Sequence, residues 1–328
     1  MGRLTLSIAM GDYDRTRPIH DGRVQIDGVD PVTKLQSPEE MFFRAFRHQT
    51  SDVSELSLSS YCVSIARGDA AYVAVPVFLS RAFRHSSIYI RADRGIKRPE
   101  DLKGRRIGIA EYQLTANVWA RAILAEHGVL PENIHWIRGG MDTAGRPEKL
   151  KLTLPDAVTI EAAPEGATLN ELLSDGEIDG FIGPRWPRCF HEGHLDVTRL
   201  WQDSEAEATG WFKKTGIFPI MHVLGVRKSL AETHPWLPGA LLKAFSAAKR
   251  LATDALADTS APKVTMPFVE DTLARSAKLG RELWTYGLPG NEAALAYFLN
   301  AHHAQGLSPR RLEVSDLFHP STQESFSL

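Results

Sequence analysis

The sequence predicts an α/β protein of two lobes, each built on its own sheet. Short segments rich in Val, Ile and Phe alternate with amphipathic segments of helical period, which is typical of sheets with helical connections. The chain has 328 residues, about twice the length of a common domain, and this favours two domains. After residue 226 the pattern is almost entirely helical, so this part cannot supply a sheet of its own.

Strands are predicted where β-branched and aromatic residues gather between turn residues. They are expected at 4–10, 32–35, 53–56, 71–78, 88–91, 105–110, 135–137, 178–182 and 217–226. The first of these segments alternates like a strand, and no basic leader with an apolar stretch precedes it, as a secretory signal would require. We therefore expect a cytoplasmic protein.

Helices are predicted where apolar residues recur with a helical period between capping residues. They are expected at 37–46, 59–66, 115–127, 168–174, 236–257, 269–284 and 291–304. Ser37 and Glu40 have the spacing of a capping box at the start of the first helix. Gly68 and Gly128 stand where a helix is expected to end.

The order of these elements predicts where the lobes begin and end. The strand–helix–strand unit within 105–137 favours a parallel pair with a right-handed crossover, which places a second lobe at 101–219. The C-terminal helices are expected to pack on the first lobe, which then comprises 1–100 and 220–328. The chain would cross between the lobes twice, with a ligand cleft between them. Loops at the carboxyl ends of the strands are expected to line this cleft.

Composition excludes several classes of function. Lys and Arg number 38 and Asp and Glu 40, so the formal net charge is −2, which argues against nucleic-acid binding and against a polybasic membrane contact. The two cysteines are too few for a disulfide scaffold or a cysteine-ligated zinc site. His191 and His194 lack the spacing and third ligand of a zinc hydrolase, and we expect no metal and no nucleotide cofactor.

The predicted post-strand loops are rich in arginine, carboxylates, hydroxyls and histidine. Five groups of residues carry this chemistry in order along the chain: Gly11–Arg15, Glu55–Ser59, Pro76–Phe78 with Arg81–Ser86, Glu111–Gln113 with Thr115–Ala116, and Gly216–His222. In these groups the sequence resembles the 4,5-dihydroxyphthalate decarboxylase family, and the resemblance covers essentially the whole chain. It implies a two-lobed type II periplasmic-binding-protein-like fold, with a mixed sheet in each lobe, used as an enzyme.

The same resemblance implies conversion of 4,5-dihydroxyphthalate to protocatechuate and CO2 in phthalate degradation. Direct loss of CO2 would leave a costly aryl carbanion. A deprotonated hydroxyl para to the leaving carboxylate instead pushes electron density into the ring, whose carbon takes a proton before CO2 departs. This route needs no cofactor. It needs a cationic clamp for the retained carboxylate, a proton donor beside the reacting carbon and an acceptor for the phenol proton.

Arginine and histidine are the candidates for the clamp and the proton donor. Arg81, Arg84 and Arg185 are candidate carboxylate ligands because guanidinium binds carboxylate bidentately; surface arginines or a hinge salt bridge are the alternatives. His85 and His222 are candidate proton donors because histidine titrates near neutral pH. Each histidine also has an ordinary structural interpretation as a hydrogen-bonded group.

Carboxylates are the candidates for the proton acceptor. Glu55 and Glu111 follow or end predicted strands, although a carboxylate at the start of a helix, as Glu111 would be, also serves as a cap. Asp14 and its neighbour Tyr13 either line the cleft or form a turn. Hydrogen bonds to the substrate carboxylates are expected from Ser57, Ser59, Gln113 and Thr115.

The expected partner is a small aromatic dicarboxylate, with no nucleic acid and no membrane. The apolar C-terminal helices leave room for a homo-oligomer interface. Two other functions remain open: a non-catalytic solute-binding protein for an aromatic or other small anion, and a decarboxylase for a related acid such as a mono-hydroxylated phthalate. The missing secretory signal favours an enzyme over a transport receptor.

Overall fold

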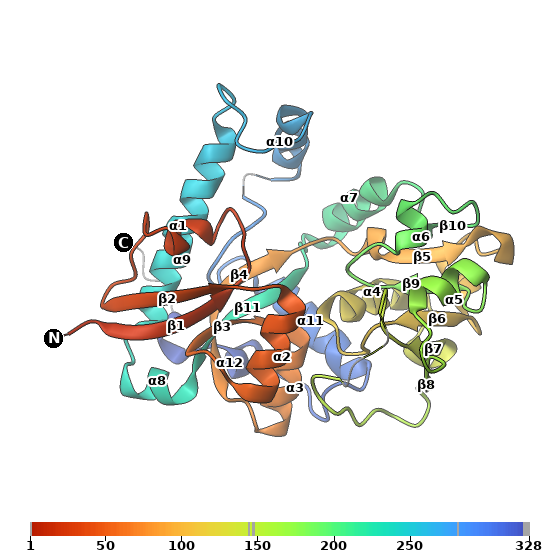
Figure 1. Ribbon diagram of the computed structural model, residues 1–328, viewed down its shortest axis with the longest axis horizontal. Coiled ribbons are helices and arrows are strands. Elements are labelled where there is room, and N and C mark those ends of the chain that lie inside the picture. The colour runs from red at the N-terminus through yellow and green to blue at the C-terminus, as the bar shows by residue number, and fades with distance from the viewer. Residues whose placement is uncertain (1, 144, 146–147, 281, 324–328) are drawn as a thin grey trace. The chain divides into compact units, whose positions relative to one another are not determined.

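The computed structural model describes residues 2–143, 145, 148–280 and 282–323. The chain divides into two compact units, each with its own sheet (Figure 1). Unit 1 holds the described residues within 1–81, 220–296 and 313–328, and unit 2 those within 82–219 and 297–312. Both sheets contain parallel and antiparallel pairs, so the predicted α/β class with two mixed sheets is confirmed.

The sheet of unit 1 has the strand order β2-β1-β3-β11-β4. Its strands are β1 (Leu4–Met10), β2 (Val29–Leu35), β3 (Val53–Ser57), β4 (Tyr72–Arg81) and β11 (Ile220–Arg227). β11 is antiparallel to both β3 and β4, and it occupies the place between these two strands. The returning strand therefore brings residues near 222 next to residues near 57, which are far apart in the sequence.

Helices cover both faces of this sheet. The helices of unit 1 are α1 (Arg17–His20), α2 (Pro38–His48), α3 (Leu58–Arg67), α8 (Lys228–Thr233), α9 (Leu237–Ala257), α10 (Val269–Leu279) and α12 (Val314–Leu317). Alternate side chains of β1 select the two faces. Ile8 and Met10 pack in one core with Phe245 of α9, whereas Ala9 packs with Met41 and Phe42 of α2.

The sheet of unit 2 has the strand order β10-β5-β9-β6-β7-β8. Its strands are β5 (Ile88–Arg91), β6 (Arg106–Ile109), β7 (His135–Arg138), β8 (Ile160–Ala162), β9 (Gly180–Ile182) and β10 (Val197–Arg199). β6 and β7 form the expected parallel pair. β5 pairs with β9 and β10, so residues 82–100 belong to unit 2 and not, as the sequence boundaries had it, to the first lobe.

The helices of unit 2 are α4 (Thr115–Ala125), α5 (Leu169–Asp175), α6 (Arg188–His191) and α7 (Ser204–Thr215), and α11 (Glu292–Ala304) belongs to unit 2 from Tyr297 onward. Trp119 of α4 is fully buried and stacks on Tyr297, with ring centroids 5.7 Å apart. This aromatic contact explains why residues 297–312 group with unit 2, where the sequence had placed all C-terminal helices on the first lobe.

Two local expectations are wrong. Ser37 is the N-cap residue of α2 but makes no side-chain capping hydrogen bond, and Glu40 instead pairs with Arg44 one turn later. The helix expected at 269–284 ends at Leu279, before Gly280. Short 3-10 helices occur at His85–Ser87, Ala92–Arg94, Pro99–Leu102, Pro131–Asn133 and Pro320–Thr322.

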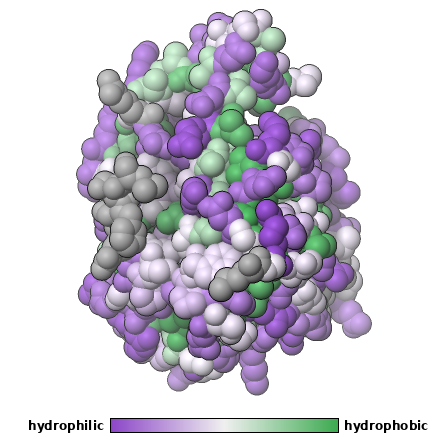
Figure 2. Space-filling model, turned by 90° about the vertical axis from the view of Figure 1, so that its left-hand side faces the viewer, coloured by the Kyte–Doolittle hydropathy of each residue, from purple (hydrophilic) through white to green (hydrophobic). Residues whose placement is uncertain are grey.

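The surface shows few exposed apolar side chains. On the face drawn in Figure 2, hydrophobic residues appear in small areas among hydrophilic ones. The exposed apolar residues include Val264, Met266 and Phe268, in the segment that joins α9 to α10. Within the described ranges, no helix combines the length and apolarity needed to cross a membrane. The predicted homo-oligomer, the cytoplasmic location and the cleft between the lobes stay predictions.

Candidate functional site

Glu55 is the centre of a buried hydrogen-bond network in unit 1. Its side chain on β3 is completely buried. The backbone N–H of Gly11 donates to Oε2 at 2.9 Å, and the hydroxyl of Tyr13 donates to Oε1 at 3.1 Å. His222 Nδ1 lies 2.6 Å from the same Oε1. The structure thus brings together two predicted site residues, Glu55 and His222, which the chain separates by 167 positions.

Gly11 is required for this network by close packing. A Cβ atom at this position would lie 2.1 Å from the ring of Tyr13, which is far inside van der Waals contact. Because glycine leaves the space empty, the ring folds back over the backbone and its hydroxyl reaches Glu55. Burial raises the pKa of Tyr13, and the charge and hydrogen bond of Glu55 add to this effect, so that the phenol remains protonated.

The carboxylate of Glu55 orients His222. A hydrogen bond from Nδ1–H to a carboxylate fixes the tautomer and the orientation of the ring. The ring also packs edge-on against Phe42, with centroids 4.8 Å apart. Its second nitrogen, Nε2, has no hydrogen bond within the described residues. The side chain is 16% exposed, so this nitrogen is suited to exchange a proton with a ligand.

Arg15 extends the polar region of unit 1. Its guanidinium lies over the rings of Tyr13 and Trp284, at 4.2 and 4.4 Å from their centroids, and its Nε donates to the carbonyl of Leu79. The predicted site residue Asp14 is exposed and forms an ion pair with Arg15. Burial raises the pKa of Tyr286, whose buried hydroxyl lacks a hydrogen-bond partner among the described residues.

The other predicted residues of unit 1 occupy buried positions. Arg81 is 5% exposed, and it donates to the carbonyl of Thr285 and to Oδ1 of Asn291. Burial lowers the pKa of Arg81 to about 10. Ser57 and Ser59 are buried where β3 leads into α3. Arg81 therefore ties β4 to the segment before α11, and a carboxylate-binding role for it stays a prediction.

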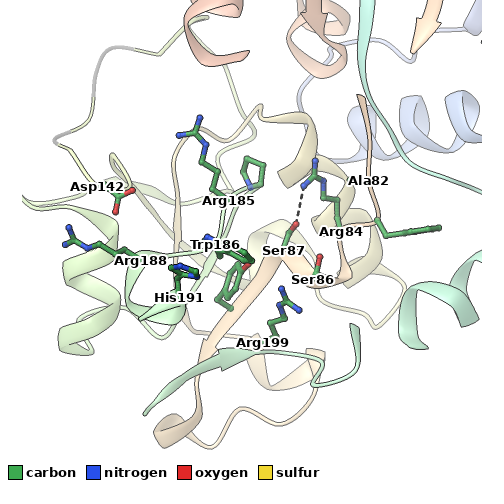
Figure 3. Close-up of a pocket in the computed structure, with 13 residues that line it drawn as sticks. Ala82, Arg84, Ser86, Ser87, Asp142, Arg185, Trp186, Arg188, His191 and Arg199 are labelled. Carbon is green, nitrogen blue, oxygen red and sulfur yellow. Dashed lines mark hydrogen bonds between the residues drawn. The ribbon is translucent and has the colours of Figure 1, made fainter. Parts of the chain in front are cut away.

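Unit 2 contains a cavity of about 630 Å³ lined by residues of the loops that follow β4 and β9 (Figure 3). Its charged side chains are Arg84, Arg185, Arg188, Arg199 and a single carboxylate, Asp142. Ser86, Ser87 and Tyr89 supply hydroxyls. Four guanidinium groups against one carboxylate give the lining an excess of positive charge, although Arg188 also pairs with Glu192. Such a lining suits an anion, because guanidinium binds carboxylate oxygens through charge-assisted hydrogen bonds.

The structure places two of the predicted arginines on this cavity. Arg84 precedes a 3-10 helix and its Nη1 lies 3.4 Å from the hydroxyl of Ser87. Burial lowers the pKa of Arg84 to about 10, which leaves the guanidinium charged near neutral pH. Arg185 comes from the exposed loop after β9. Arg81 and Arg84, three residues apart, lie in different units.

His85 has an aromatic environment. The side chain is 3% exposed and its ring packs against Trp201 and Trp211, at centroid distances of 5.4 and 5.7 Å. Nδ1 has no hydrogen-bond partner within the part of the chain that is described. Burial lowers the pKa of His85 to about 4, so the ring is neutral at neutral pH. His85 is not among the residues that line the cavity beside Arg84.

Glu111 forms a buried ion pair with Lys149. Both side chains are nearly inaccessible, and Lys149 Nζ donates to Oε2 of Glu111. Gln113 donates to the same oxygen at 3.2 Å. Thr115, the first residue of α4, is buried nearby in the sequence. The structure therefore brings together two predicted residues, Glu111 and Gln113, and adds a lysine that sequence analysis did not single out.

The missed residues share one feature, which is that none of them directly follows a strand that the sequence predicts. Lys149 lies in the long segment between β7 and β8. Arg188 is in the short helix α6, and Arg199 ends β10. Trp186 follows the predicted residue Arg185 directly, so considering the few residues after Arg185 would have found both Trp186 and Arg188. Within the described ranges, no three His, Cys, Asp or Glu side chains gather as metal ligands do.

Comparison with known proteins identifies the family. A 4,5-dihydroxyphthalate decarboxylase from Comamonas testosteroni is 57% identical over 330 aligned residues, covering 100% of both chains. The chain belongs to the 4,5-dihydroxyphthalate decarboxylase family. A second member, from Pseudomonas putida, is 57% identical over 65% of this chain and 83% of its own. Members of this family are carboxy-lyases, so the expectation of an enzyme rather than a solute-binding protein is confirmed.

A family model and solved structures of low sequence identity agree on the fold of this chain. The family model described as NMT1/THI5 like matches residues 78–148. The periplasmic aliphatic sulphonate binding protein SsuA from Escherichia coli has a TM-score of 0.55 at 15% identity, covering 99% of this chain and 95% of its own. SsuA from Xanthomonas axonopodis has a TM-score of 0.52 at 14% identity, covering 97% and 99%. The periplasmic-binding-protein-like fold is thereby confirmed.

Proposed function

We propose that this protein converts 4,5-dihydroxyphthalate to protocatechuate and CO2 without a cofactor. The full-length relative from Comamonas testosteroni that carries this enzyme's name, at 57% identity, is the observation that carries the proposal. The pair of His222 and Glu55 supports it, because a histidine oriented by a carboxylate is a common general acid.

The proposed chemistry places a proton on the ring carbon before CO2 leaves. A base removes the proton of the hydroxyl para to the leaving carboxylate, and electron density moves into the ring. The ring carbon bearing that carboxylate then gains a proton and becomes tetrahedral. The carbon–carbon bond breaks, its electron pair restores the aromatic ring as a phenolate, and CO2 is released. The phenolate then takes back the proton held by the base. One proton is consumed for each CO2 formed.

Specific residues are proposed for these steps. His222 donates the proton to carbon through Nε2, and Glu55 holds the ring by Nδ1 and stabilises the imidazolium. Arg84 and Arg185 bind the retained carboxylate in the arginine-lined cavity. Glu111 is proposed as acceptor of the phenol proton. The leaving carboxylate is expected to stay weakly paired, because tight pairing there would stabilise the ground state and slow the step.

The test is turnover by the purified full-length protein. With 4,5-dihydroxyphthalate and no added metal, we expect protocatechuate and CO2 in equal amounts, and a chelator should leave the rate unchanged. In D2O the product should carry one deuterium at the carbon that lost its carboxylate. Unchanged substrate would overturn the proposed activity, and loss of turnover with chelator would overturn its cofactor-free form.

Two analogues sharpen this assay. Phthalate has both carboxylates but no hydroxyl, so it should bind without losing CO2. 4-Hydroxyphthalate keeps one hydroxyl para to a carboxylate, so its turnover relative to 4,5-dihydroxyphthalate measures how strongly the second hydroxyl is required. Faster turnover of the mono-hydroxylated acid would assign the enzyme to that substrate instead.

A further inference from the structure

An exposed tryptophan lines the arginine-rich cavity of unit 2. Trp186 is 53% exposed although it lies on the cavity wall. The ring of His191 stacks on it almost in parallel, with centroids 5.0 Å apart and planes inclined by 14°. His191 therefore covers one face of the indole and holds its plane. The exposure of Trp186 indicates that the other face remains open to a ligand.

The charged groups of the cavity stand around this aromatic pair. In the view of Figure 3, Trp186 and His191 lie between Arg185 and Arg188 on one side and Arg84 and Arg199 on the other. Guanidinium groups bind carboxylates edge-on, in the plane of the carboxylate. A flat ring that carries carboxylates at its rim therefore matches an aromatic surface with arginines around it.

We propose that Trp186, backed by His191, is the stacking surface by which the cavity selects aromatic diacids over non-aromatic diacids with the same two carboxylates. This inference rests on the proposed function for the identity of the ligand class. The arginines contribute affinity for any small diacid. Trp186 contributes the preference for a planar ring, because a puckered saturated ring cannot lie flat on the indole.

The size of the preference follows from the energy of stacking. A flat ring stacked on an aromatic side chain contributes binding energy beyond the area that it buries. Since 1.4 kcal/mol corresponds to a tenfold change in Kd, loss of the indole should weaken binding of an aromatic diacid about tenfold. Binding of the saturated analogue should change less than about twofold.

The experiment compares two probes by titration calorimetry on the full-length protein. Phthalate is the aromatic probe, and cis-cyclohexane-1,2-dicarboxylate is the non-aromatic probe with the same pair of carboxylates. The variants are Trp186→Leu, which removes the ring, and Trp186→Phe, which keeps one. Trp236→Leu is the matched control, because Trp236 is also exposed and beside a histidine but lies in unit 1.

We expect the wild type, Trp186→Phe and Trp236→Leu to prefer phthalate, and Trp186→Leu to bind the two probes about equally. Equal binding of the two probes by the wild type would overturn the inference, as would an unchanged preference in Trp186→Leu. If Trp186→Leu fails to fold, the wild type and Trp186→Phe decide: phthalate should quench tryptophan emission in the wild type and much less in Trp186→Phe. The preference for phthalate without turnover of 4,5-dihydroxyphthalate would overturn the proposed function alone.

Discussion

The two buried glutamates, Glu55 in unit 1 and Glu111 in unit 2, have different partners. Glu55 accepts hydrogen bonds from a backbone N–H and a tyrosine hydroxyl and holds His222. Glu111 instead pairs with the ammonium of Lys149. In the first pair the His222 side chain is 16% exposed, so its second ring nitrogen can meet a ligand. The side chains of Glu111 and Lys149 are both nearly inaccessible, so the comparison sets a pair with a partly exposed ring nitrogen against an enclosed ion pair.

The largest expected effect is on catalysis at the first glutamate. Glu55→Gln keeps the shape of the side chain but removes the charge that supports the imidazolium of His222. We expect kcat for 4,5-dihydroxyphthalate to fall about 10³-fold, within the range known for general acid–base groups and their orienting carboxylates. KM should change little. Steady-state kinetics measures kcat and KM, and a thermal unfolding curve of the same sample checks that the variant is folded. A proportionate rise in KM would contradict the role given to Glu55.

The second prediction concerns the ion pair. Lys149→Met leaves the carboxylate of Glu111 buried without its partner, which should lower the free energy of unfolding by about 3 kcal/mol. The double variant Glu111→Gln with Lys149→Met removes both charges and should recover most of this loss. Lys151→Met, at an exposed position of the same segment, is the control. Urea unfolding measures all three.

The activity of the double variant decides whether Glu111 is structural or accepts the phenol proton. If the refolded double variant keeps the wild-type kcat, Glu111 is structural and is not the acceptor of the phenol proton. If stability recovers but kcat stays more than tenfold low, the proposed acceptor role of Glu111 is supported. A double variant as unstable as Lys149→Met would contradict the ion-pair explanation.

His222 and His85 also differ in environment, and the pH dependence of stability tests the buried state of His85. Burial lowers the pKa of His85 from 6.5 to about 4, so the folded protein resists protonation that the unfolded chain accepts. The stability contributed by the neutral ring is complete above pH 6.5 and is lost as the pH falls from 6.5 toward 4. His85→Phe removes this titration, and its melting temperature should fall less than that of the wild type across this range. Parallel curves for the two proteins would contradict the buried neutral state.

The sequence predicted the fold better than it predicted the hydrogen-bond network around Glu55. Clusters of β-branched and aromatic residues located most strands, and helical periodicity located most helices, because these signals are local. The partner of Glu55 was not readable, since His222 reaches it only through the insertion of β11 between β3 and β4. The boundary at 82–100 was missed for the same reason: β5 resembles any apolar strand, and only its pairing with β9 assigns it to unit 2.

Residues that are close together in the sequence also differ in their contacts, because burial and not residue type decides what each side chain does. Arg81 and Arg84 look equivalent in the sequence, but Arg81 is bound to Thr285 and Asn291 in unit 1 whereas Arg84 lines the anion cavity in unit 2. Lys149 carried no local signal of function, and Trp186 carried only its position after Arg185, because burial beside a carboxylate and exposure on a cavity wall are properties of the folded chain.

The smallest expected effect separates these two arginines. Arg84→Ala should raise KM for 4,5-dihydroxyphthalate about tenfold, since a hydrogen bond to a charged group contributes about 1.5–3 kcal/mol, while the melting temperature stays near that of the wild type. Arg81→Ala should show the opposite pattern, because it leaves the carbonyl of Thr285 and the amide of Asn291 without their buried donor. His85→Ala should raise KM much less than Arg84→Ala. A KM effect at Arg81 as large as that at Arg84 would mean that the arginine between β4 and α11 also binds substrate, and the division between a structural and a ligand-binding arginine would fail.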